Sequence, residues 1–84
     1  MTLEQTILDC KLEPIDHIKT DTGELSVYTA HGPNQGDHFY LTASDNGSVI
    51  LSVMPEDEEA DTLVITFSRW HESIAALVEQ LTCQ

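Results

Sequence analysis

The sequence predicts an α+β fold, in which an antiparallel meander of about five strands carries a C-terminal helix on one face and a short N-terminal helix precedes the sheet. Three observations predict it. Several short segments alternate apolar and polar residues, as half-buried strands do, and turn signals separate these segments. An apolar stripe of helical spacing follows the last strand and needs a sheet to cover, so residues 1–84 are expected to form one two-layer domain.

The first expected element is a short helix from about Leu3 to Lys11. Thr2 and Gln5 are spaced as a capping box, and apolar residues then recur at helical spacing. Pro14 is expected to end this helix. Residues Ile15 to Thr20 favour a first strand, although they alternate poorly.

The middle of the chain reads as two further strands joined by a loop. Leu25 to Ala30 alternate as a half-buried strand, and the loop from His31 to Asp37 is rich in Gly and Pro. A third strand follows from His38 to Ala43. Asn46-Gly47 then predicts a tight hairpin turn into the next strand.

The last part of the chain predicts two strands and a helix. Val49 to Met54 is apolar on both faces, which is typical of a strand that is covered on both sides or packed against a partner. After an acidic connection, Leu63 to Phe67 alternate as the last strand. Ser68 is expected to cap a helix that reaches about Leu81. Its apolar stripe comprises Trp70, Ile74, Leu77, Val78 and Leu81, with Trp70 expected to cover the sheet beside Phe67 and Leu63.

The charge of the chain limits its partners. Fifteen acidic residues oppose three basic ones, giving a formal net charge of -12, whereas a small domain needs a net charge of only about 2 to 8 for solubility. Such a charge repels nucleic acid and anionic membranes, so neither is expected as a direct partner. A basic protein, in particular one that binds nucleic acid, is the expected partner.

The expected location is the cytoplasm. No apolar stretch approaches the roughly 20 residues that span a bilayer, and the segment from Met1 to Glu4 lacks the features of a signal peptide. Cys10 and Cys83 are expected to be free thiols in a reducing compartment, with a bridge between them as the alternative.

Motifs for catalysis, metals or cofactors do not occur in the sequence. No Gly-x-Ser-x-Gly elbow and no Gly-rich phosphate loop is found. Zinc ligands are usually closely spaced, and the histidines do not follow such a pattern, although His31, Asp37 and His38 frame one loop. We therefore expect no enzymatic activity, no cofactor and no metal. The four histidines are His17, His31, His38 and His71, of which His71 is expected to face a partner.

The acidic residues are the candidate partner-binding residues. Five of them crowd into the connection before the last strand, and a second set falls at strand starts and turns. Alternate residues of a strand lie roughly 6.7 Å apart, so carboxylates on strands and turns can approximate the spacing of backbone phosphates. The first set is Glu56, Asp57, Glu58, Glu59 and Asp61, and the second is Asp16, Asp21, Glu24, Asp37 and Asp45.

A family resemblance agrees with this hypothesis. Val27-Tyr28-Thr29-Ala30, a polar loop and then Tyr40-Leu41-Thr42-Ala43-Ser44-Asp45 resemble the strand-loop-strand order of uracil-DNA glycosylase inhibitors. In its acidity and size the chain is similar to the wider class of phage inhibitors that mimic nucleic acid, which includes several anti-CRISPR proteins. The resemblance implies occupation of a nucleic-acid-binding cleft. The segment Ile15 to Glu24 has no counterpart there, so no binding residues are transferred.

The sequence thus predicts a non-enzymatic inhibitor that blocks a basic, nucleic-acid-binding surface of a larger protein. An immunity protein that neutralises a toxin nuclease would follow the same physics. A different alternative is a structural or adaptor homodimer formed through Val49 to Met54 and the last helix, in which acidity serves only solubility. A small core and a strand apolar on both faces favour self-association, so a homodimer is expected.

Overall fold

The protein forms one antiparallel sheet and two helices in a computed structural model, which describes residues 1–82. The five strands follow one another in the sheet in chain order, β1-β2-β3-β4-β5. This confirms the predicted α+β meander. The elements are α1 (Leu3–Asp9), β1 (Glu13–Thr20), β2 (Gly23–His31), β3 (His38–Ser44), β4 (Val49–Met54), β5 (Leu63–Phe67) and α2 (Glu72–Leu81).

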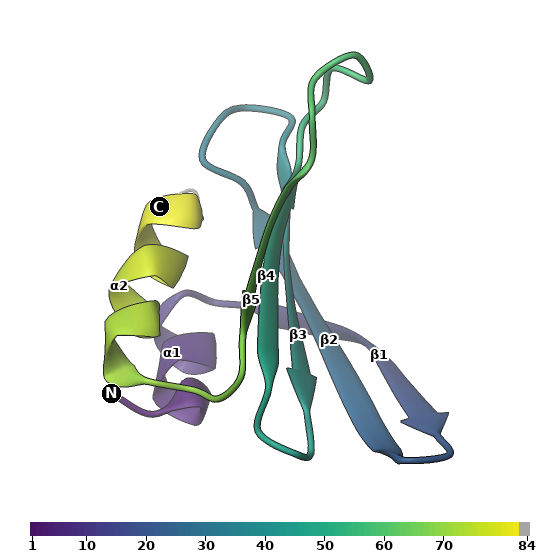
Figure 1. The fold of residues 1–84 in the computed structure, drawn as a ribbon. Helices are drawn as coiled ribbons and strands as arrows, with labels where there is room; N and C mark the ends of the chain where they lie inside the picture. The colour runs from purple at the N-terminus through teal and green to yellow at the C-terminus, as the bar shows by residue number, and fades with distance from the viewer. Residues whose placement is uncertain (83–84) are drawn as a thin grey trace.

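Both helices lie on the same face of the sheet (Figure 1), and among residues 1–82 no helix covers the opposite face. The two helices also contact each other. The chain alternates between the two ends of the sheet, so the turns after β1 and β3 lie at one end and the loops after β2 and β4 lie at the other. Within residues 1–82, no helix has the length and apolarity needed to cross a membrane.

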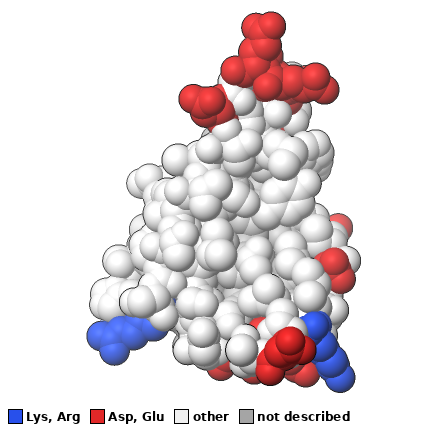
Figure 2. Space-filling model, turned by 45° about the vertical axis from the view of Figure 1, so that its right-hand side comes forward, with Lys and Arg blue, Asp and Glu red and all other residues white. Residues whose placement is uncertain are grey.

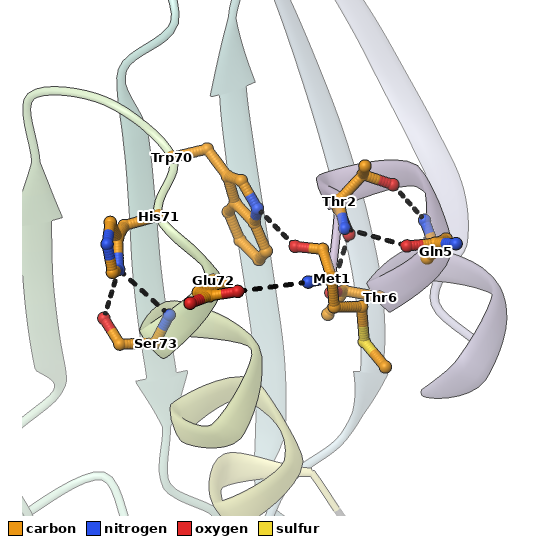
Figure 3. Close-up of polar contacts among 8 residues, drawn as sticks. All are labelled: Met1, Thr2, Gln5, Thr6, Trp70, His71, Glu72 and Ser73. Atoms are coloured by element: carbon orange, nitrogen blue, oxygen red, sulfur yellow. Dashed lines mark hydrogen bonds and ion pairs between the residues drawn. The ribbon is translucent and has the colours of Figure 1, made fainter.

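The predicted capping box starts α1. The Thr2 hydroxyl accepts the Gln5 backbone N–H over 3.1 Å, and the Gln5 side chain accepts the Thr2 N–H over 3.0 Å (Figure 3). The helix ends earlier than predicted, because Cys10 caps it and Lys11 adopts a left-handed backbone with φ 56°. Pro14 already belongs to β1, which is an edge strand and therefore tolerates a proline.

The core lies between the helices and the middle of the sheet. Phe39 and Leu41 of β3 are fully buried, as is Leu51 of β4, which pairs with Leu41. Burial of each such side chain stabilises the fold by roughly 1.5–3 kcal/mol. The buried cluster comprises Leu12, Phe39, Leu41, Val49, Leu51, Val53, Ile74 and Val78.

The start of α2 differs from the prediction. His71, and not Ser68, is the N-cap: its Nδ1 accepts the Ser73 backbone N–H over 3.1 Å, and its ring also contacts the Ser73 hydroxyl (Figure 3). His71 thus has a capping role, and because it is also exposed, the expectation that it faces a partner stays a prediction. A histidine cap requires a ring nitrogen in the right place, which the sequence pattern does not reveal.

Trp70 precedes α2 and is only half-buried. It packs against the core, and its Nε1–H donates to the Met1 carbonyl over 3.1 Å (Figure 3). The Met1 ammonium lies 3.8 Å from the Glu72 carboxylate, so the first residue is held against the start of α2. Trp70 does not cover Leu63 as predicted, because Leu63 pairs with Val53 at the opposite end of β5. Cys83, and with it the question of a bridge to Cys10, lies outside the described residues.

Candidate functional site

Six acidic side chains gather at one end of the sheet. They come from the loop after β2 and the loop after β4, which the meander places side by side. Figure 2 shows a dense group of red side chains at this end and no blue ones near it. We call this group the acidic tip; it comprises Asp37, Glu56, Asp57, Glu58, Glu59 and Asp61.

Hydrogen bonds give the acidic tip a defined shape. The Glu56 backbone N–H donates to Asp37 Oδ1 over 3.3 Å and so links the two loops. Asp57 Oδ1 accepts the Glu59 N–H over 3.0 Å, which closes a local turn. At Gly36, φ is +89°, a conformation that favours glycine, and a Cβ there would displace the Glu56 carboxylate from the close approach of the two loops.

Three further predicted residues lie at the opposite end of the sheet. Asp21 is in the turn after β1, Glu24 is near the start of β2, and Asp45 is in the turn after β3. The Asp45 N–H donates to the Glu24 carbonyl over 3.0 Å, so these two turns are also linked. We call this group, Asp21, Glu24 and Asp45, the turn end.

Asp16 belongs to neither group. It lies on edge strand β1 opposite Val27, and its carboxylate accepts the His17 backbone N–H over 2.8 Å. The predicted acidic residues therefore form two clusters at opposite ends of the sheet and one edge position. Within residues 1–82, strands β2 to β5 carry no carboxylate between these ends.

On the face of the sheet turned away from the helices, strands β2 to β5 carry no Lys, Arg, Asp or Glu, and Asp16 of β1 lies at the edge of this face opposite Val27. Residues paired across the strands share a face, and the buried partners identify the helix side as that of Leu41 and Leu51. Figure 2 shows the other side as a white field below the acidic tip. We call it the open face; strands β2 to β5 contribute Leu25, Val27, Thr29, His31, His38, Tyr40, Thr42, Ser44, Ile50, Ser52, Met54, Val64 and Thr66.

Large apolar side chains remain solvent-exposed on the open face. Ile50, Met54 and Val64 are 37%, 49% and 58% exposed. The sequence indicates the outward residues of β4, because Val49 to Met54 is apolar on both faces. It does not reveal those of β2, where Leu25 and Val27 turn outward while Tyr28 faces the helices.

A hollow of about 640 Å³ lies where β1 begins beside the end of β2. His31 and His38, which the sequence placed at one loop, pair across β2 and β3 and both line it. No group of three or more potential metal ligands occurs among residues 1–82. Cys10 also lines the hollow, and burial, followed by the nearby Glu79 carboxylate, raises the pKa of its thiol above the ordinary 9.0.

One set of polar contacts has the residue types of a hydrolase triad. Ser26 Oγ lies 3.3 Å from His17 Nδ1, and His17 Nε2 lies 3.3 Å from Glu24 Oε2. All three residues are on the surface, about half of the His17 and Glu24 side chains being exposed. None of them lines the hollow beside β1. The contacts therefore connect β1 to β2 across the surface and do not enclose a substrate.

Comparison of the chain with protein-family models, with curated proteins and with solved structures found no match. Its function is therefore inferred from charge, exposure and geometry. The acidic tip and the open face are the two surface features that a folded core does not explain. Both are typical of contact with another molecule.

Proposed function

We propose that this chain is a non-enzymatic inhibitor that binds a larger protein and blocks a basic surface used for nucleic-acid binding. The acidic tip carries the proposal. Its six carboxylates come from two loops, residues 32–37 and 55–62, that contain neither Lys nor Arg. None of the six forms an ion pair within residues 1–82, so no cation of the described residues neutralises their charge.

The chemistry of the acidic tip suits a phosphate-binding protein. Lys and Arg side chains that bind phosphate oxygens bind carboxylate oxygens in the same way, with charge-assisted hydrogen bonds. A net charge of -12 also accelerates encounter with a basic partner. The same charge repels nucleic acid, so the protein competes with nucleic acid for its target and does not bind it.

A pair of matched variants tests which acidic cluster binds. Glu56→Gln, Glu58→Gln and Glu59→Gln together remove three charges from the acidic tip. Asp21→Asn, Glu24→Gln and Asp45→Asn remove three from the turn end, so both variants carry -12 + 3 = -9. Partners captured from lysate at low and at high salt are identified and purified. Their affinity for the wild-type protein and for each variant is then measured.

We expect the tip variant to lose more affinity than the turn-end variant, although their net charges are equal. Binding of the wild-type protein should weaken steeply with salt, because exposed charges more than about 8 Å apart are screened at physiological ionic strength. The protein should also release nucleic acid from the partner in a gel-shift assay. The proposal would be contradicted by a stable partner whose affinity is the same at low and high salt and the same for the wild type and the tip variant.

A further inference from the structure

We infer that the open face is the docking surface for the partner, and that the partner's contact region is apolar in its centre and ringed by Lys and Arg. This inference rests on the proposed function, because it takes the partner to be a basic protein. It adds where the partner sits and what else its surface must contain. The acidic tip alone would bind any dense group of cations.

Apolar side chains run across the open face in rows. Val27 pairs with Thr42, Thr42 with Ile50, and Ile50 with Thr66, so one row crosses four strands. The next row contains Tyr40 and Val64. Ser and Thr residues lie between the apolar side chains, and their hydroxyls can hydrogen-bond to water or to a partner. Such a face loses exposed apolar area when a partner covers it.

The charges around the open face identify its occupant. The acidic tip lies at one end, the turn end at the other, and Asp16 at the β1 edge. The outward positions of β2 to β5 hold neither Lys nor Arg, nor any carboxylate. A complementary surface therefore presents apolar side chains to the middle and cations to the margins.

A second copy of the chain fits this surface poorly. Stacking two open faces in parallel places one acidic tip against the other, and stacking them antiparallel places each acidic tip against a turn end that carries three carboxylates and, beside Glu24, Lys19. Each copy also brings a net charge of -12. Like charges across an interface oppose association. Charge complementarity therefore favours a basic partner over the homodimer that the sequence predicts.

The size of the open face indicates that the partner also reaches an acidic end. Four strands about 4.8 Å apart are about 14 Å wide, and six residues of a strand are about 20 Å long. Their product, about 290 Å², is less than half of the roughly 800 Å² that each partner buries in a standard interface. Contact with the acidic tip as well supplies the remaining area.

Three synthetic octapeptides test the inference by NMR titration of the labelled protein. The first has two Lys at each end and an apolar Leu-Val-Leu-Val middle; the second keeps the four Lys but has Ser in the middle; the third keeps the apolar middle but has Ser at the ends. We expect the first to bind about tenfold more tightly than the others, a difference of about 1.4 kcal/mol. The shifted backbone amides should include those of Ile50 and Val64.

A double variant, Ile50→Thr with Val64→Thr, keeps β-branched residues on the strands but removes apolar area from the open face. It should lower affinity for the first peptide about tenfold. Leu8→Gln is the matched control, because Leu8 is 77% exposed on α1, on the helix side. This control should bind like the wild type.

Different outcomes of these titrations overturn either the inference alone or the inference together with the proposed function. Equal affinity for the first two peptides, unaffected by the double variant, would overturn docking on the open face and leave acidic-tip binding in place. Failure of both Lys-containing peptides to bind would overturn the inference together with the proposed function. Sedimentation of a dimer that the double variant dissociates would overturn it in favour of a second copy as the occupant.

Discussion

The Glu56 backbone N–H donates a hydrogen bond to Asp37 Oδ1, although the two residues belong to different loops. The bond, 3.3 Å long, holds two acidic residues together at the acidic tip. Nineteen positions separate them in the chain. The shape of the charged end thus depends on a contact between two hairpins of the meander and not on the Glu-rich run alone.

Removing this acceptor should loosen the acidic tip. In Asp37→Ala, the Glu56 amide loses its partner, and we expect its hydrogen exchange to become several-fold faster, because an exposed hydrogen bond contributes about 0.5–1.5 kcal/mol. Asp37→Asn is the control, since its side-chain oxygen still accepts while its charge is lost. Equal exchange in the wild type and Asp37→Ala would show that this bond does not hold the loops together.

Gly36→Ala should destabilise the protein more than Gly47→Ala does. Both glycines have positive φ, +89° and +97°, so both substitutions cost about 1 kcal/mol of backbone strain. Only at Gly36 does the added methyl group meet another side chain, the Glu56 carboxylate; at Gly47 nothing lies within 4 Å. Urea unfolding of the two variants measures the difference, and equal losses would mean that the exposed Glu56 side chain turns aside to admit the methyl group.

Trp70→Ala should lower the free energy of unfolding by about 2–3 kcal/mol, less than the roughly 3–5 kcal/mol of a fully buried tryptophan, because Trp70 is half-buried. Trp70→Phe keeps most of the packing and removes the Nε1–H bond to Met1, so we expect a loss of about 1 kcal/mol. Denaturant unfolding followed by circular dichroism gives both values. A similar loss in the two variants would assign the effect to the hydrogen bond.

Strong local signals made much of the fold predictable. The Asn46-Gly47 turn and the acidic loop bracket β4, and the sequence predicts Val49–Met54 and Leu63–Phe67 with the boundaries that the structure has. The exact ends of the helices were not predictable. The start of α2 depends on a ring nitrogen of His71, and the end of α1 on the left-handed conformation of Lys11.

The acidic tip was partly predictable and the open face was not. The run from Glu56 to Glu59 is visible in the sequence, and in a meander the loops after β2 and β4 must lie at the same end, which brings Asp37 to it. No local pattern tells which side of β2 faces the helices. Tyr28 takes that side, and the more apolar pair Leu25 and Val27 is left outside because the register with β3 decides the orientation.

The Cys10 thiol should react slowly with alkylating reagents near neutral pH. Burial and the Glu79 carboxylate raise the pKa of this thiol, so less of it is the reactive thiolate at a given pH. In a Cys83→Ser background, which leaves one thiol, Glu79→Gln should lower that pKa and increase the alkylation rate. A pH profile of iodoacetamide labelling measures both, and an unchanged profile in Glu79→Gln would show that the Glu79 carboxylate does not raise the pKa of this thiol.

Charge reversal at the acidic tip should leave the fold intact while abolishing partner binding. Glu56→Lys, Glu58→Lys and Glu59→Lys together change the net charge from -12 to -12 + 6 = -6, which relieves self-repulsion in the folded state. Asp57 is kept, because its carboxylate accepts the Glu59 N–H. We expect an unchanged or higher melting temperature by calorimetry, and no measurable binding to the partner at low salt. A reversed variant that melts normally and still binds would show that the loop is only a solvated connection and that binding depends on another surface.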